Sequence, residues 1–167
     1  MIYLRVNQGA TSWGSGYNDG ELHHLGLACP ASATLADCYV VLDGSSLGNG
    51  SGTRAINTGN ASSDLRICQG DQTSLPSTHY FLGSVDDACV WSTDLSVSQF
   101  QDIYNSKLNG FCRQIESDSL EMNLTLDDIA NGDDGDGDTF RDQSGNDRDG
   151  TGENGPTGSA NGILSYP

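Results

Sequence analysis

The feature that most constrains the fold is the stretch 83–104, in which a strand pattern leads directly into one short helix. Two sets of residues alternate along its first half, namely Val85, Asp87, Cys89 and Trp91 against Asp86, Ala88 and Val90. Because both sets contain apolar side chains, the pattern predicts a strand that is covered on both faces.

The second half of this stretch predicts a helix that starts after Ser96. Ser96 can cap the first turn, and Gln99 can return a hydrogen bond to it as in a capping box. Leu95 can pack on Phe100 as a hydrophobic staple. The apolar face of the helix is then formed by Phe100, Ile103 and Tyr104.

Most of the remaining chain carries strand and turn signals, which predicts an all-β protein. Further strands are expected at 2–6, 21–29, 38–43, 65–69 and 120–126, with a short edge strand at 54–57. Asp43 and Gly44 predict a tight hairpin turn, whereas 9–20 is expected to be a polar loop. With 22 Gly and only 35% hydrophobic residues, a thin two-layer sandwich is favoured over a helical bundle.

Several of these segments resemble motifs of laminin-G-like domains, which have the concanavalin A-like jelly-roll fold. Residues 83–104 resemble the family's closing Ile-Asp-Asp strand and helix, and CYVVLDG resembles its Tyr-Val-Asp-Gly strand. ELHHLGLAC is similar to its Trp-His-His-Val-Ala strand, with Leu22 in place of Trp, and 138–167 is similar to the family's opening segment. The resemblance implies an all-β jelly-roll β-sandwich with one short helix.

The motifs occur in permuted order relative to this family. Residues 1–110 match the later strands and closing helix, 111–117 is expected to be a linker, and 118–167 is an acidic, Gly-rich segment that resembles the first strand and loop. Three explanations are compatible with this order: a window cut from tandem repeats, a permuted domain, or a subunit whose tail completes a neighbour's sandwich. In the last two explanations, the strand near 119–128 pairs with strands of residues 1–107. Pairing across subunits is favoured.

The charge of the chain limits its partners. Seven Lys and Arg against 23 Asp and Glu give a formal net charge of -16. Nucleic acid and anionic membranes are therefore not expected as partners, and no apolar run is long enough to insert into a bilayer. Cations are expected to bind, Ca²⁺ above all.

Five cysteines without a C-x-x-C pair predict disulfides instead of a zinc or redox site. Cys29 and Cys38 flank a short loop, and a disulfide there would stabilise the connection by roughly 2 to 3 kcal/mol. The resemblance pairs Cys68 with Cys89, on strands that lie close together in the family. Cys112 is then left over, either free or bonded to another chain.

Three N-x-[ST] sequons are candidate glycosylation sites, at Asn49, Asn60 and Asn123. Together with the disulfides they predict an extracellular protein, either secreted or on the cell surface.

Two groups of acids are candidate Ca²⁺ ligands. The first is a D-x-D-x-D run in a Gly-rich loop, where carboxylates and carbonyls can converge on a hard cation, formed by Asp134, Asp136 and Asp138. Its alternative is a solvated acidic loop. The second is the pair Asp86 and Asp87, for which the resemblance implies a structural Ca²⁺ shared with Asp127 and Asp128. The alternative for this pair is a hydrogen-bonded acid that closes the sandwich end.

Aromatic rings beside amides and acids in the loop 9–20 can dock sugar rings. The candidate ligand-binding residues are Trp13, Tyr17, Asn18 and Asp19. The alternative for the aromatic residues is ordinary packing at the base of a loop. His23 and His24 alternate along a strand, so they cannot both face one metal and are expected to be structural.

The chain is not expected to be an enzyme. One E-x-D-x-x-E run resembles the catalytic strand of laminarinase-type glycoside hydrolases, through Glu116, Asp118 and Glu121. Retaining hydrolysis needs two carboxyls on one face about 5 to 5.5 Å apart. Those enzymes place apolar residues between the acids, where this chain has Ser117 and Ser119, so a glycoside hydrolase is kept only as a minor alternative.

The predicted function is therefore a non-catalytic extracellular recognition or adhesion module, stabilised by Ca²⁺, with a carbohydrate or an extracellular protein as partner. The main alternative is a structural subunit of an extracellular filament or sheath, assembled by strand exchange between neighbouring copies. Two features favour that alternative: the unpaired cysteine, and the family's strands that have no counterpart in this sequence between its last and its first segments. The fold alone does not choose between them, because function resides in sites placed on a fold.

Overall fold

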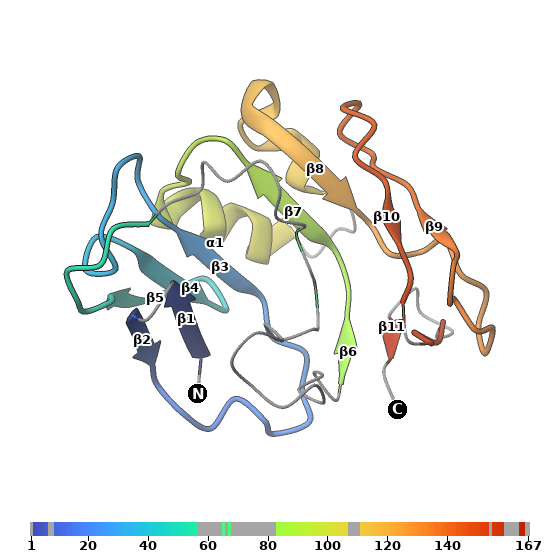
Figure 1. The fold of residues 1–167 in the computed structure, drawn as a ribbon, viewed down its shortest axis with the longest axis horizontal. Helices are drawn as coiled ribbons and strands as arrows, with labels where there is room; N and C mark the ends of the chain where they lie inside the picture. Colours follow the sequence, from blue (N-terminus) through green and yellow to red (C-terminus); the bar gives the residue numbers. More distant parts are fainter. Residues whose placement is uncertain are drawn as a thin grey trace. The chain divides into compact units, whose positions relative to one another are not determined.

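The computed structural model describes residues 2–6, 9–56, 65, 67, 83–106, 111–153, 155–158 and 164–165. In this part of the chain most regular structure is antiparallel strand, with one α-helix and two short 3-10 helices (Figure 1). The chain divides into two compact units, Met1–Gly59 with Val90–Glu121 and Asn60–Cys89 with Met122–Pro167. The predicted all-β class is thus confirmed at this coarse level.

The first unit contains β1 (Ile2–Val6), β2 (Gly9–Trp13), β3 (Leu25–Ala28), β4 (Tyr39–Leu42), β5 (Ser45–Asn49), α1 (Val97–Ser106), η1 (Phe111–Gln114) and η2 (Ser117–Ser119). The other strands are β6 (Ser84–Val85), β7 (Ala88–Trp91), β8 (Leu120–Leu124), β9 (Thr139–Phe140), β10 (Gly150–Thr151) and β11 (Leu164–Ser165). The prediction of a loop over 9–20 is wrong for β2, which pairs antiparallel with β1.

The three-stranded sheet of the first unit has the order β3-β4-β5. The turn predicted at Asp43 and Gly44 lies between β4 and β5. Leu42 pairs with Ser45, so only Asp43 and Gly44 lie between β4 and β5. Both turn residues have positive φ, 48° and 73°, as a two-residue hairpin of type I′ requires. The predicted hairpin is confirmed.

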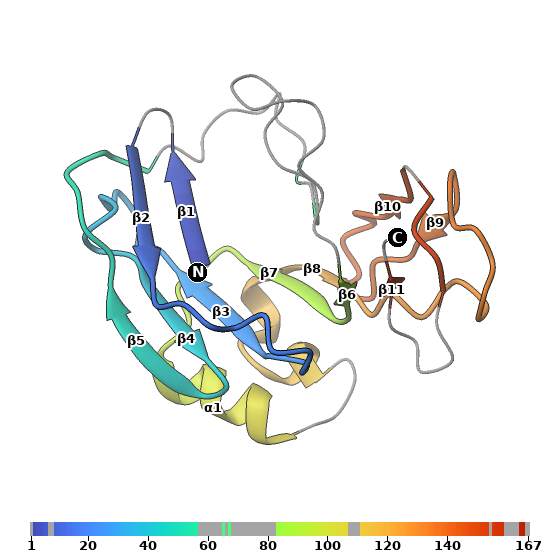
Figure 2. The same cartoon turned by 90° about the horizontal axis from the view of Figure 1, so that it is seen from below.

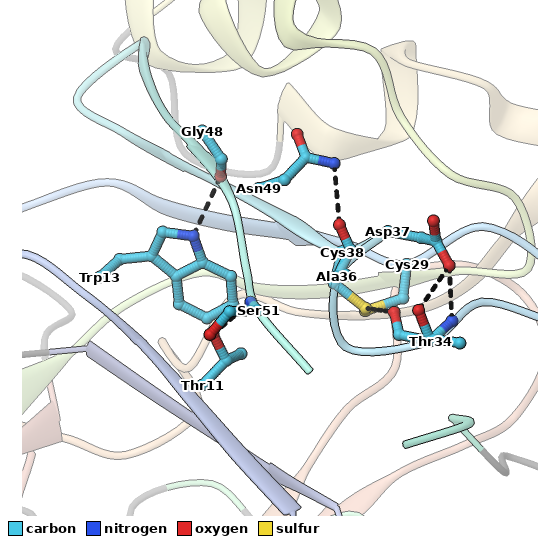
Figure 3. The surroundings of a disulfide bond; sticks show 10 residues. All are labelled: Thr11, Trp13, Cys29, Thr34, Ala36, Asp37, Cys38, Gly48, Asn49 and Ser51. Carbon is cyan, nitrogen blue, oxygen red and sulfur yellow. Dashed lines mark hydrogen bonds between the residues drawn. A yellow bond between two sulfur atoms is a disulfide. The ribbon is translucent and has the colours of Figure 1, made fainter. Parts of the chain in front are cut away.

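A disulfide closes the connection between β3 and β4 (Figure 3). It joins Cys29 to Cys38, as predicted, with 4.3 Å between the two Cα atoms. Beside it, Asp37 Oδ2 accepts hydrogen bonds from the backbone N–H and the hydroxyl of Thr34, both at 2.8 Å. These contacts order the short loop between the two strands.

Helix α1 begins with the predicted capping box. Ser96 N–H donates to Gln99 Oε1 at 2.7 Å, and Gln99 N–H donates to Ser96 Oγ at 3.3 Å. Leu95 and Phe100 are buried in the same core cluster, as the predicted staple requires. Tyr39 adds a hydrogen bond from its hydroxyl to the Leu95 carbonyl, which ties β4 to the start of the helix.

The two faces of the sheet are covered differently. Gly26 and Val41 pair across β3 and β4 on the face toward α1, and a Cβ on Gly26 would stand 2.5 Å from the Phe100 ring. Helix and strand can therefore approach closely only because this residue has no side chain. The β1–β2 hairpin lies on the other side of the sheet (Figure 2), where Trp13 Nε1 donates to the Gly48 carbonyl at 3.0 Å.

The strand predicted over 85–91 is interrupted. Asp87 has φ 48°, a left-handed conformation that Asp tolerates, and the preceding Asp86 Oδ1 accepts its N–H at 3.1 Å. The interruption separates β6, which pairs with β11, from β7, which pairs with β8. Val90 is exposed, so the prediction of a strand covered on both faces is also wrong.

The strand predicted over 120–126 is confirmed as β8, and its partner β7 belongs to the same chain. The expected preference for pairing across subunits is not needed to explain this strand. β8 contributes to the core of the second unit, which contains Met122, Leu124, Leu126, Ile129 and Phe140, with Val85 and Ala88 packed against it.

The acidic, Gly-rich segment after β8 folds into two antiparallel, strand-like segments, although it contains few apolar residues. The ladder runs from the β9–β10 pair to the isolated bridge between Asp134 and Thr157. Backbone hydrogen bonds between the bridged positions join Gly135 to Pro156 and Gly137 to Gly152. A Cβ on Gly152 would stand 2.0 Å from the Gly135 carbonyl oxygen, so Gly is needed for the two segments to approach.

Asp142 anchors the loop between β9 and β10. Its carboxylate accepts hydrogen bonds from the backbone N–H groups of Asn123, Ser144 and Arg148, and from the Ser144 hydroxyl. Burial by itself would raise the pKa of Asp142, but these four donors outweigh it and lower the pKa to about 2.

Three predictions about covalent chemistry need correction. Cys89 and Cys112 are each in a disulfide bond, so Cys112 is not left over. A Cys68–Cys89 pair would leave Cys112 without a partner in this chain, so that prediction is wrong too. Asn123 has no exposed surface and its Nδ2 is buried, so a glycan there is incompatible with this structure.

Other predicted features are confirmed in part or lie outside the described residues. Asn49 is exposed, as an acceptor site must be, and its Nδ2 donates to the Ala36 carbonyl at 3.2 Å. The edge strand expected over 54–57 is reduced to one bridge, between Thr34 and Ala55. Cys68 and Asn60 lie outside the described residues, as does most of the strand predicted over 65–69.

The close approach at Gly26 predicts the effect of a single methyl group. Gly26→Ala should destabilise the protein by about 1 to 3 kcal/mol, because the added Cβ overlaps the Phe100 ring. Urea unfolding of the wild type, Gly26→Ala, Phe100→Leu and the double variant measures the coupling between the two positions. We expect the double variant to lose less than the sum of the two single losses, and strict additivity would contradict the overlap.

The Asp142 contacts predict a specific dependence of stability on pH. Since the folded-state pKa lies below the ordinary 3.8, this group stabilises the fold above about pH 4 and the contribution disappears as the pH falls toward 2. Asp142→Asn should cost about 1 to 3 kcal/mol at pH 7 and remove that acid-dependent component. Asp147→Asn, an exposed change in the same loop, is the control for thermal unfolding between pH 2 and 7.

Candidate functional site

Trp13 is not available to a ligand. Its side chain is only 4% exposed, and its indole N–H already donates to the Gly48 carbonyl. The alternative expectation, packing at the base of the loop, is therefore the correct one for this residue. The remaining three candidates follow β2 in the loop that leads toward β3, and they lie at the surface.

Tyr17, Asn18 and Asp19 form the exposed part of this loop. Asn18 and Asp19 are exposed and Tyr17 is half-buried. The Tyr17 hydroxyl occupies the space where a Cβ on Gly14 would stand, and Gly14 has φ 47°, so a glycine there lets the tyrosine fold back over the loop. Asp19 Oδ1 accepts the Glu21 N–H at 3.0 Å, which closes a tight turn at the end of the loop.

His23 connects this loop to the sheet. Its Nε2 lies 3.1 Å from Asp19 Oδ1 and its Nδ1 lies 2.7 Å from Asp43 Oδ2, so each ring nitrogen faces a carboxylate. The hydrogen bond to Asp43, followed by the one to Asp19, raises the pKa of His23. The Glu21 N–H, followed by His23, lowers the pKa of Asp19. Tyr17 presents a ring edge to His23, with centroids 6.2 Å apart.

Asp43 holds this arrangement from the hairpin turn. Its Oδ1 accepts the His24 N–H at 2.9 Å, and its own N–H donates to the His24 carbonyl at 2.9 Å. The His24 ring lies on the other side, where its centroid is 6.4 Å from that of Phe100 and 6.2 Å from that of Tyr104. Burial, only partly opposed by the charge of Asp43, lowers the pKa of His24.

The surface formed by Tyr17, Asn18, Asp19 and His23, here called the Tyr17 surface, combines an aromatic ring with an amide, a carboxylate and an imidazole. Such groups can pack on a sugar ring and exchange hydrogen bonds with its hydroxyls. Sequence analysis found three of these residues and missed the role of His23. The Asp-Gly turn signal located Asp43, but the pairing of β3 with β4 was needed to bring it to His23.

The predicted metal ligands fall into separate groups. Asp86 is close to Asp87 and Asp127 at the interruption between β6 and β7. Although its side chain keeps contact with solvent, partial burial, followed by the charges of Asp87 and Asp127, raises the pKa of Asp86 to about 6. The charges of Asp87 and Asp127 therefore oppose ionisation of Asp86, which is a condition that a divalent cation relieves.

The other acids make local contacts. Asp128 Oδ2 accepts the Arg141 N–H at 3.1 Å, and Asp134 Oδ1 accepts the Asp136 N–H at 3.0 Å. Asp134, Asp136 and Asp138 are all exposed. Across the residues that the structure describes, no group of three or more His, Cys, Asp or Glu side chains is arranged to hold a metal ion. Neither of the two predicted groups of ligands is therefore arranged as such a site among these residues.

The E-x-D-x-x-E run is not on one strand. Glu116 has φ 47° and precedes η2, Asp118 lies within η2, and Glu121 is in β8. Glu116 Oε1 accepts a hydrogen bond from Gln99 Nε2 at 2.6 Å, which ties it to the start of α1. The alternation along a strand that the hydrolase alternative requires is absent at these residues.

The surroundings of Asp86 predict that substituting this residue changes Tm differently with and without Ca²⁺. Since the pKa of Asp86 is raised, its ionisation destabilises the fold as the pH rises through about 6, and the penalty is absent below about 4. In chelator at pH 7, Asp86→Asn should therefore raise Tm. If Ca²⁺ binds here, it should raise the wild-type Tm by several degrees, since 1 kcal/mol corresponds to about 2 to 4 °C, and raise that of the variant less.

Asp118→Asn, at an exposed position in η2, is the matched control for this experiment. Melting curves in Ca²⁺ and in chelator that coincide for the wild type would exclude Ca²⁺ as a stabilising ligand. A lower Tm for Asp86→Asn in chelator would contradict the raised pKa of Asp86.

Among the described residues, no helix has the length and apolar character needed to cross a membrane. The chain was compared with models of known protein families, with curated proteins and with solved structures, and none of them matches.

Proposed function

We propose that the chain is a non-catalytic extracellular recognition module of the laminin-G-like jelly-roll type, which binds a carbohydrate at the Tyr17 surface. The observation that carries the proposal is the contact network in which His23 joins Asp19 of the loop to Asp43 of the sheet. It holds an aromatic ring, an amide and a carboxylate at the surface of a disulfide-closed sheet, which limits the entropy lost when a ligand binds.

The disulfides support an extracellular location. Cys29 and Cys38 are joined, and Cys89 and Cys112 are also in disulfide bonds. Such bonds persist in oxidising compartments and are rare in the cytosol. The exposed sequon at Asn49 is compatible with the same location.

Ca²⁺ is proposed as a stabilising ion and not as a catalytic one. The support is the raised pKa of Asp86, about 6, which is caused by partial burial and then by the charges of Asp87 and Asp127. A cation at this point would offset the repulsion near the interruption between β6 and β7. The formal net charge of -16 acts in the same direction, because it concentrates cations near the protein.

The filament alternative has less support. Its support in the sequence is the missing strands, which a neighbour's tail would replace, and an unpaired Cys112. β8 pairs with β7 of the same chain, and Cys112 is in a disulfide bond. What remains in its favour is an exposed apolar strip on β3, where Leu25 is 53% and Leu27 is 46% exposed.

Carbohydrate binding is tested on a glycan array, followed by titration calorimetry with the best sugar. We expect Tyr17→Ala to weaken binding roughly tenfold, and Asp19→Asn to weaken it by a similar factor, because each removes a contact of the proposed surface. Asp102→Asn, an exposed change on α1, is the control and should bind as the wild type does.

Equal affinity of the wild type and Tyr17→Ala for the same sugar would exclude this surface as the site. Sedimentation of the purified chain addresses the filament alternative at the same time. Concentration-dependent growth beyond a small oligomer, with no sugar bound, would favour the structural subunit over the recognition module.

A further inference from the structure

We propose that His23 is a proton-controlled latch that holds the loop 14–21 against the β3–β4 hairpin. In its protonated form it bridges Asp19 and Asp43, and in its neutral form it releases Asp19. The effect of the latch on ligand binding rests on the function proposed above, whereas the latch itself does not.

The geometry requires a protonated ring for both contacts. A carboxylate can only accept hydrogen bonds, and the two ring nitrogens face Asp43 Oδ2 at 2.7 Å and Asp19 Oδ1 at 3.1 Å. The imidazolium carries a proton on each nitrogen, so it can donate to both acids, whereas neutral imidazole carries only one. Loss of one proton therefore breaks one of the two contacts.

The contact that breaks is the one with Asp19. Asp43 is less exposed, its contact is shorter, and it is fixed by two further hydrogen bonds with the His24 backbone. The remaining proton therefore stays on Nδ1, between His23 and Asp43. The lone pair of Nε2 then points at the Asp19 carboxylate, so attraction between these two groups becomes repulsion.

Two carboxylates and one phenol ring face His23 among the described residues. They belong to Asp19, Asp43 and Tyr17. His24 faces α1 on the opposite side, and its pKa is lowered by burial. Glu21 contributes its backbone N–H to Asp19 and carries an exposed side chain.

The release is local to the loop. Asp19 Oδ1 is shared between the Glu21 N–H and His23 Nε2, so the same oxygen closes the turn and attaches it to the sheet. Gly14, Gly16 and Gly20 have positive φ and give this segment conformational freedom once it is detached. The carboxylates of Asp43 and Asp19 raise the pKa of His23 above its ordinary 6.5, so the latch is still closed at pH 6.5 and opens at a higher pH.

Nuclear magnetic resonance of the full chain between pH 5.5 and 9 tests the latch without any ligand. The imidazole signals of His23 are followed beside the amide exchange of residues 18–21, corrected for intrinsic rates. We expect exchange to become roughly tenfold faster across the transition, with the same midpoint as the imidazole titration. His23→Gln, which keeps a neutral donor at every pH, should abolish the transition.

Two results would overturn the latch: loop amides that do not respond while His23 titrates, or an unchanged transition in His23→Gln. His24→Gln is the matched control and should keep the transition. A sugar from the array is then titrated at pH 6 and pH 8.5, where the latch predicts weaker binding at the higher pH. If the loop amides respond but no sugar binds, the latch stands and the proposed ligand is wrong.

Discussion

The first unit and its candidate site depend on the hydrogen bonds of Asp43. One residue supplies the left-handed turn between β4 and β5, accepts the His24 N–H at the start of β3, and contacts the ring of His23. An amide at this position could supply the turn, but it would not hold a protonated imidazole with the same strength. The hairpin, the entry into β3 and the exposed loop are therefore coupled through a single side chain.

The second unit also uses a carboxylate, that of Asp142, as a hydrogen-bond acceptor that joins separate parts of the chain. Asp142 accepts four hydrogen bonds from β8 and from its own loop, and Gly135 and Gly152 let two strand-like segments approach closely. Few apolar residues are available in this region, so charge-assisted hydrogen bonds, most of them partly buried, replace part of the missing hydrophobic stabilisation. The repulsion at Asp86 is the exception and marks the place where a cation would help most.

The pairing of β8 with β7 joins two distant segments of one chain. β8 comes from the stretch after residue 118, and β7 from the stretch that leads into α1. This pairing removes the main reason to expect strand exchange between copies. Leu25 and Leu27 remain exposed apolar side chains on β3, which is the first strand in the order of its sheet.

Local patterns were sufficient for features that depend on neighbours in the chain: the Ser96 capping box, the Asp43-Gly44 turn, the β8 strand and the Cys29–Cys38 disulfide. The capping box, the turn and the disulfide join residues that are close in the chain, whereas β8 was predicted from its own alternation although its partner β7 is distant. Burial of Trp13, the contact of His23 with Asp43, and the break at Asp87 required the tertiary structure, because each depends on which strands pair. Sequence alternation gives the two faces of a strand, but only packing decides which face is covered.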